Sequence, residues 1–317
     1  MISRRNIRVK VMQTLYSLEL YNSPDAENSG DSVDLLPRAK RLLQQHLDLT
    51  TRLFSYILFN VAAVARYVET DARQRASKRL PTAEDLNVNT RLAGNACMLH
   101  LLEDPAFART IERENFRLLE DREITKKLYL SLVRSPEYQA YLEGPAKTEK
   151  EDRKILLFIF QELLLKSEPF DQHVEDLFLN WPDDKEMMGI LVGNYLNKPA
   201  AFDFGELISE EKRTYAFSLL ETVLEKREYC LELIRPRLQN WDPDRIAAID
   251  MLLMNMGICE FLFFPTIPTK VTINEYIDLA KTYSTPQSGQ FVNGLLDNVL
   301  KDLNAAEKIS KTDHVKK

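Results

Sequence analysis

Two groups of side chains in this sequence have the chemistry needed to hold a nucleic acid. The first is a set of four cations, Arg4, Arg5, Arg8 and Lys10, in the first two turns of an expected helix. Cations at a helix N-terminus oppose the macrodipole by roughly 0.3 kcal/mol or more each, and an external anion would remove that conflict. Tyr16, on the Arg5 side of the helix, adds a ring that RNA bases can contact. The alternative interpretation is a basic face that is simply solvated.

The second group is a pair of aromatic residues, Tyr283 and Phe291, on either side of a polar corner. With 3.6 residues per turn, each ring falls near the edge of the apolar stripe of its own helix, where it can be half exposed. Such rings can seal the rim of a core, or they can form a stacking platform for unpaired bases. The sequence leaves both interpretations open.

The elements that carry these rings are predicted to be two helices between residues 264 and 303. Thr272 and Glu275 have the spacing of a capping box, which predicts the start of the first helix. Gly294 is expected to let another helix approach closely. Ser284 and Pro286 predict the start of the second helix at the corner.

Composition predicts an almost purely α-helical protein. The chain has 317 residues and only nine glycines, and its apolar residues recur at helical rather than alternating spacing. This length allows two domains or one large one. The net charge of −6 argues against a protein that coats polyanions in general, so any nucleic-acid contact has to come from a local basic patch.

Further helices follow from the same periodicity. We expect one at 3–21 with Ser3 as its cap, a linker at 22–34, and one long helix or two in line at 37–78. Five or six more helices are expected between 80 and 201, broken by prolines and glycines. The central helix is expected at 245–261, with Asp242 as its cap.

A run of mixed charge, TIERENFRLLEDREITKK, lies at 110–127. It predicts an exposed helix with ion pairs along its surface, and a solvated face is favoured over a docking site.

Several classes of function have no support in the sequence. The P-loop, dinucleotide, zinc-protease and serine-hydrolase motifs do not occur, so we expect neither catalysis nor a cofactor. His173 and Asp176 are three residues apart, but they have no second histidine to complete a metal site. Three widely spaced cysteines suit reduced core thiols. With no secretory signal or membrane-length apolar run in the sequence, we expect a cytoplasmic protein.

Three segments, at 4–17, 215–262 and 267–300, together resemble NusB-type transcription antitermination proteins. The most specific match is the order I-P-x-K-V-x-I-N-E, L-A-K and F-V-N-G in the last segment. The resemblance implies an all-helical fold of two packed helical subdomains. It also implies binding of boxA-type RNA together with the small-subunit ribosomal protein that acts as NusE. The complex would act on RNA polymerase to promote read-through, notably in ribosomal RNA operons.

The resemblance also implies roles for individual residues. By position, the proteins of this family would place partner contacts at Asp250 and Thr269. This chain has Gln287, Gln290 and Thr269 where the family often has an acidic, a basic and an aromatic residue. RNA affinity and the ribosomal-protein contact can therefore both differ. The RNA-binding positions would be Arg4, Arg5, Arg8, Tyr16, Tyr283, Gln287 and Phe291.

The expected domain organisation follows from the matched segments. Residues 1–21 and 209–303 would form the NusB-like RNA-binding domain, and 22–208 a helical insertion or an extended N-terminal subdomain. Residues 304–317 would be a flexible tail. An alternative function is a helical scaffold whose insertion docks a protein partner, with RNA binding incidental.

Overall fold

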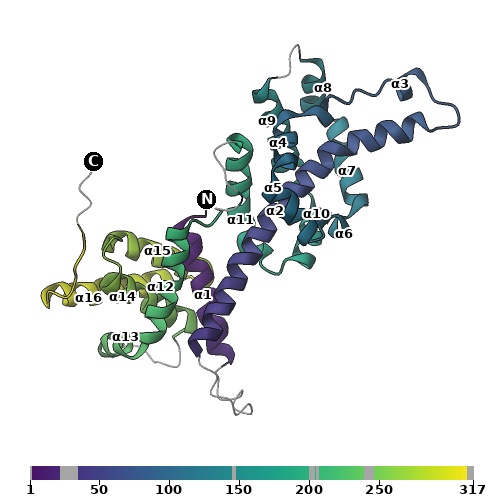
Figure 1. Cartoon of the computed structure of the whole chain (residues 1–317). Helices are drawn as coiled ribbons and strands as arrows, with labels where there is room; N and C mark the ends of the chain where they lie inside the picture. Colours follow the sequence, from purple (N-terminus) through teal and green to yellow (C-terminus); the bar gives the residue numbers. More distant parts are fainter. Residues whose placement is uncertain are drawn as a thin grey trace. The chain divides into compact units, whose positions relative to one another are not determined.

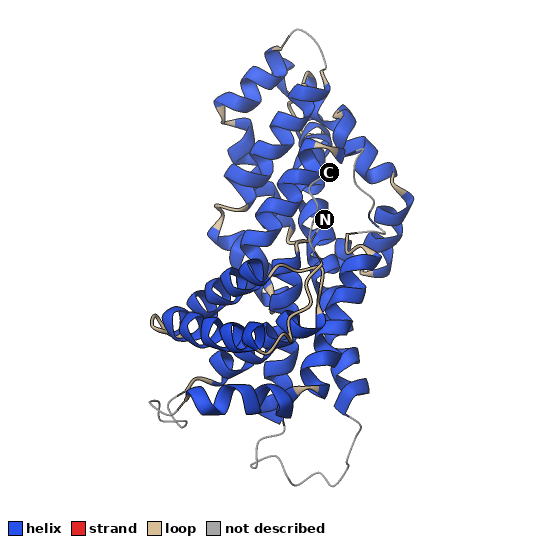
Figure 2. Ribbon diagram, turned by 90° about the vertical axis from the view of Figure 1, so that its left-hand side faces the viewer, coloured by secondary structure: helices blue, strands red, loops and turns tan. Residues whose placement is uncertain are grey.

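The computed structural model describes residues 2–21, 35–144, 148–199, 204, 207–238 and 246–312. Every regular element among these residues is a helix, and Figure 2 draws no strand in them. The predicted all-α class is therefore confirmed. The α-helices are α1 (Arg4–Tyr21), α2 (Leu35–Ala76), α3 (Ala83–Leu86), α4 (Ala96–Glu103), α5 (Pro105–Arg113), α6 (Phe116–Leu119), α7 (Arg122–Val133), α8 (Pro136–Glu143), α9 (Glu149–Phe158), α10 (Glu168–Leu177), α11 (Trp181–Asn197), α12 (Glu210–Glu225), α13 (Arg227–Ile234), α14 (Ala248–Phe263), α15 (Thr269–Tyr283) and α16 (Ser288–Ala305).

The chain folds as two compact units. Unit 1 is formed by Met1–Ile2 and Asp48–Ile208, and unit 2 by Ser3–Leu47 and Ser209–Lys317. Unit 2 thus combines α1 with the helices that follow residue 208. It also includes the first part of α2, which the sequence grouped with the insertion.

Unit 2 is built around α14, which packs against α1, α12, α13, α15 and α16 (Figure 1). Its side chains are buried around most of its circumference, because apolar residues occupy nearly every position from Leu252 to Phe261. A helix that is apolar all round has to be a core helix. Asp242, the predicted cap, lies outside the described residues, and α14 begins at Ala248 rather than at 245.

Unit 1 contains the rest of α2 and the helices α3 to α11. Its core includes an aromatic cluster in which Tyr56 contacts Phe116 and Phe178, with ring centroids 5.3 and 5.2 Å apart. Among the helices of the described ranges, α2 alone has an 18-residue window apolar enough to cross a membrane, and 72% of that window is buried inside the protein. Such burial is typical of a core helix.

The charged run at 110–127 does not form the single helix that its pattern predicts. It divides into the end of α5, the short α6 and the start of α7. Asn115 adopts a left-handed conformation with φ of 53° after α5, which is tolerated best by asparagine and glycine. Asp121 then caps α7 by accepting hydrogen bonds from the backbone N–H groups of Glu123 and Ile124. Local caps and turns therefore override the helical pattern.

Part of the region after 303, which the sequence predicts to be a flexible tail, has defined contacts. Helix α16 continues to Ala305, and the segment beyond it folds back onto the end of α14. The Lys311 Nζ donates hydrogen bonds to the backbone oxygens of Glu260 and Phe264, and the Thr312 N–H donates to the oxygen of Pro265. The last five residues lie outside the described part of the chain.

A glycine does allow close helix packing in unit 2, but it is Gly257 and not the predicted Gly294. A Cβ at Gly257 would lie 3.0 Å from Leu296 Cδ2 and 3.3 Å from Tyr276 Cδ2, whereas a Cβ at Gly294 would meet nothing within 4 Å. The absence of a side chain at Gly257 therefore allows α14 to pack closely against α15 and α16.

These two glycines give two variants with opposite expected effects on stability. Gly257→Val is expected to lower the free energy of unfolding of unit 2 by about 1–3 kcal/mol, because it overpacks a filled core. Gly294→Ala is expected to raise it by about 0.5–1 kcal/mol, because alanine favours an exposed helix and meets open space. Hydrogen exchange of the amides of α14 and α16 measures both changes. Equal effects at the two positions would contradict the close approach at Gly257.

Candidate nucleic-acid interface

A buried carboxylate, that of Glu260 on α14, organises the helices that carry the predicted RNA-binding residues. Arg8 of α1 donates from Nε to Glu260 Oε1 at 2.7 Å and from Nη2 to Oε2 at 3.0 Å. Tyr276 donates to Oε1 at 2.9 Å and Thr272 to Oε2 at 2.9 Å, both from α15. Tyr215 of α12 also donates to Oε1. Four helices therefore meet at one side chain that is fully buried.

The negative charge of Glu260 helps to keep Arg8, Tyr215 and Tyr276 protonated. Burial alone would lower the pKa of Arg8, but the hydrogen bonds and the negative charge of Glu260 outweigh it and hold the pKa above the ordinary value. Burial, together with the charge of Glu260, raises the pKa of both Tyr215 and Tyr276 well above the ordinary range. The two hydroxyls thus stay protonated and donate to the carboxylate. Arg8 also forms an ion pair with Glu275, with Nη1 and Oε2 3.3 Å apart.

This position of Arg8 differs from the predicted one. The sequence places Arg8 on an RNA-facing surface, yet only 2% of its side chain is exposed and its guanidinium is held by Glu260. A phosphate cannot reach it without breaking the core of unit 2. Thr272 also differs from its predicted role as a helix cap. It lies inside α15 and donates to Glu260 instead of capping the helix with Glu275.

The two preceding arginines are partly exposed. The side chain of Arg4 is 38% exposed and pairs with Glu211 of α12 at 2.5 Å, with its guanidinium 5.7 Å from the ring centroid of Tyr215. The side chain of Arg5 is 40% exposed and lies 3.8 Å from the carboxylate of Asp278 on α15. Exposed pairs of this kind are weak, so both cations remain accessible to another anion.

The ion pair of Arg5 places the basic start of α1 beside the last part of α15. Asp278 is five residues from Tyr283, which corresponds to about 7–8 Å along a helix. Tyr283 ends α15, Gln287 is exposed in the corner, and Phe291 follows in the first turn of α16. Both rings are half-buried, as their positions at the stripe edges predict.

Asp250 on α14 binds the corner between α15 and α16. The Ser288 hydroxyl donates to Asp250 Oδ2 at 2.6 Å, and the Thr285 N–H donates to the Ser288 hydroxyl oxygen at 3.2 Å. Only 5% of Asp250 is exposed. Its other oxygen, Oδ1, is buried without a hydrogen-bond partner among the described residues. Asp250 therefore fixes the backbone that separates Tyr283 from Phe291.

The structure does not bring the two predicted partner-binding residues together. Asp250 lies in the first turn of α14, beneath the corner, whereas Thr269 is half-buried at the opposite end of α15. Tyr16 is half-buried on α1, eleven residues or about 16 Å along the helix from Arg5.

The residues considered for a metal site have other partners. Tyr56 Oη lies 2.8 Å from His173 Nε2, and Asp171 accepts hydrogen bonds from Trp181 Nε1 at 2.8 Å and from Lys185 Nζ at 2.5 Å. Over the described ranges, no group of three or more His, Cys, Asp or Glu side chains is arranged to hold a metal ion.

Sequence reasoning missed Glu260, Tyr215, Asp278 and Ser288. Glu260 had one available indication, an acidic residue in the middle of the apolar run that follows the first turn of α14. A charge in such a position has to be paired, and the arginines of α1 are natural partners. Ser288 had no comparable indication.

The fold and the site define an all-helical protein in which a basic helix start lies near an aromatic corner. The NusB family model matches residues 186–301. Curated proteins named transcription antitermination protein NusB, from several bacteria, are similar to this chain. The protein of Methylacidiphilum infernorum is 42% identical over 101 residues, which cover 32% of this chain and 70% of that relative. The protein of Natranaerobius thermophilus is 35% identical over 117 residues, which cover 36% of this chain and 84% of that relative.

This chain belongs to the NusB family. The protein of Salinibacter ruber is 43% identical over 100 residues, which cover 32% of this chain but only 62% of that relative. No solved structure was found that matches the chain.

The buried cluster predicts a large difference between two charge-removing variants. Glu260→Gln is expected to lower the free energy of unfolding of unit 2 by about 3–5 kcal/mol, because Arg8 loses its buried counter-charge. Glu275→Gln, which removes a partly exposed partner of the same arginine, is expected to cost less than about 1 kcal/mol. Hydrogen exchange of the α14 amides reports both values. A similar small loss in both variants would show that Glu260 does not organise unit 2.

Proposed function

We propose that unit 2 binds a boxA-type single-stranded RNA and acts, with a ribosomal protein of the NusE type, in transcription antitermination. The observation that carries this proposal is the pair of half-buried rings, Tyr283 and Phe291, around an exposed corner near the basic start of α1. Membership of the NusB family and the names of the relatives support it.

The chemistry of this surface suits an unpaired strand. Aromatic rings bind bases through stacking, which contributes about 1–3 kcal/mol per base and needs no defined base sequence. Arg4 and Arg5 supply cations for phosphates, and both give up only exposed ion pairs to do so. Gln287 presents an amide that can both donate to and accept from a base edge. Arg8 is left out of this surface because it is buried.

Asp250 contributes to this surface as a positioning residue. Its hydrogen bond from Ser288 holds the corner that carries Gln287, so it acts through the backbone rather than by touching RNA. Tyr16 would extend the RNA path along α1.

The partner protein would bind elsewhere on unit 2. Thr269 starts α15 and lies about 21 Å along the helix from Tyr283. A ribosomal protein at that end leaves the aromatic corner open, so RNA and protein can be bound together. The complex would act on RNA polymerase in the cytoplasm, and the protein would be non-catalytic, as expected for a member of this family. If unit 1 is instead the main binding region, RNA affinity will not depend on the corner.

Phe291 tests the stacking interpretation. Phe291→Ala is expected to weaken binding of a boxA-type RNA by roughly 1–3 kcal/mol, or about 5- to 150-fold in Kd, because one base loses its stacking partner. The measurement is fluorescence anisotropy with labelled RNA, with the ribosomal protein supplied.

The control is Phe263→Ala, which removes an exposed ring elsewhere in unit 2, at the end of α14. It should leave RNA affinity unchanged. An unchanged Kd for Phe291→Ala, together with a loss of thermal stability, would show that this ring only seals the rim of the core.

A further inference from the structure

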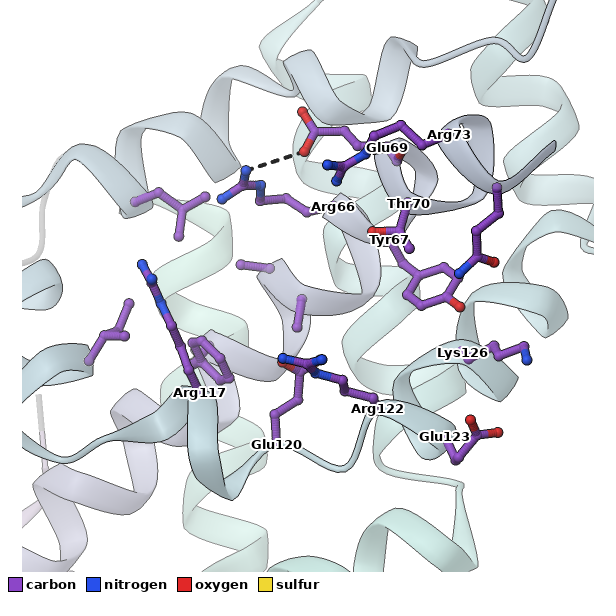
Figure 3. A pocket seen from close by; sticks show the side chains of 16 residues that line it. Arg66, Tyr67, Glu69, Thr70, Arg73, Arg117, Glu120, Arg122, Glu123 and Lys126 are labelled. Carbon is purple, nitrogen blue, oxygen red and sulfur yellow. Dashed lines mark hydrogen bonds and ion pairs between the residues drawn. The ribbon is translucent and has the colours of Figure 1, made fainter. Parts of the chain in front are cut away.

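We propose that unit 1 carries a second binding site for single-stranded nucleic acid, independent of the surface on unit 2. The site is a groove of about 760 Å³ between the second half of α2 and the α6–α7 segment. Figure 3 shows Arg66 and Arg73 on one side of this space and Arg117 and Arg122 on the other. With Lys126, these five side chains define the basic groove.

The charge of the basic groove is opposite to that of the whole chain. Its lining contains five cations and three carboxylates, those of Glu69, Glu120 and Glu123, whereas the chain has a net charge of −6. A concave surface with an excess of one sign of charge concentrates ions of the opposite sign, and here the cations are in excess. The ligand expected here is therefore an anion.

Among the described residues, ion pairing within the protein involves Arg66 but not the other four cations of the basic groove. Arg66 pairs with Glu69 at 3.2 Å, and Arg73 Nε donates to the backbone oxygen of Glu69 at 3.1 Å. The side chains of Arg117, Arg122 and Lys126 have neither an ion pair nor a hydrogen bond within the described residues, and all three are exposed. These three cations are available to a ligand.

Helix stability does not account for Arg122 either. Arg122 is the first residue of α7, directly after its cap Asp121. A cation in the first turn opposes the helix macrodipole, by about 0.3–1 kcal/mol when exposed. A bound anion would reverse the sign of this effect.

The walls of the basic groove favour a nucleic acid over an acidic peptide. Tyr67 lines the groove as a half-buried ring, and it contacts the ring of Tyr129 at a centroid distance of 5.1 Å. A fixed ring beside several cations can stack a base while its phosphates are bound. Four of the five cations are arginines, whose planar guanidinium groups bind phosphate through paired hydrogen bonds and also stack on bases. An acidic peptide would use the charges but not the ring.

The test measures binding of the full-length protein to a labelled 20-nucleotide oligouridylate, which contains no boxA element. The variant Arg117→Gln/Arg122→Gln is expected to bind at least ten times more weakly at low salt. Its plot of log Kd against log salt concentration should be shallower by about 1.4, because each phosphate contact to a single strand contributes about 0.7. The matched control is Arg109→Gln/Lys127→Gln, which removes two exposed cations from α5 and α7 outside the groove lining. The control should change affinity less than twofold.

Binding of an oligothymidylate that depends on the same two arginines would also support the proposal, and its strength relative to oligouridylate would say whether RNA or DNA is preferred. An equal loss in the groove and control variants would overturn it, since the effect would then be general electrostatics. Oligouridylate binding that is unaffected by Arg117→Gln/Arg122→Gln would also overturn it. Binding of oligoglutamate in the groove, with oligouridylate binding intact in the variant, would assign the groove to a protein partner instead. Because Phe291 is in unit 2, the outcome of its replacement is separate from all of these results.

Discussion

The carboxylate of Glu260 is the interaction on which the rest of unit 2 depends. Taking this charge and that of Arg8 out of water costs several kcal/mol per ion, and the cost is offset only when every remaining donor and acceptor is satisfied. Arg8, Thr272 and Tyr276 donate to its two oxygens, and Tyr215 adds a further donor. Because these donors come from α1, α12 and α15, the pairing sets the orientation of α1. Arg4 and Arg5, one helical turn earlier, lie near the same face of α1, but they are at its N-terminal end, where their side chains stay partly exposed.

A second acidic side chain, Asp250, positions another part of unit 2 from the opposite end of α14. It holds the corner between α15 and α16 through Ser288, while Gly257, between the two acids, lets α15 and α16 approach closely. The central helix therefore fixes both parts of the proposed RNA surface, the basic start of α1 and the aromatic corner. Asp250 and Glu260 both belong to unit 2. The basic groove of unit 1 is a separate feature formed by α2, α6 and α7.

The sequence predicted much of this arrangement, and its errors have physical causes. Helical periodicity identified the all-α class, the long α2 and the half-exposed positions of Tyr283 and Phe291. Arg8 was misplaced because it adjoins an apolar stripe, and only a buried partner 252 positions away in sequence makes its burial possible. The charged run at 110–127 was misassigned because a turn at Asn115 and a cap at Asp121 break a continuous helical pattern. Such outcomes depend on tertiary contacts and local backbone conformation, which spacing alone does not determine.

The most direct test of the central claim is photo-crosslinking of a boxA-type RNA to the full-length protein with the ribosomal partner present, followed by mapping of the crosslinked peptides. If the Glu260 cluster orients unit 2 as described, crosslinks will fall on the peptide that contains Tyr283 and Phe291 and on the one that contains Arg4 and Arg5. Crosslinks to unit 2 confined to α13, with none at the corner or at the start of α1, would contradict this account.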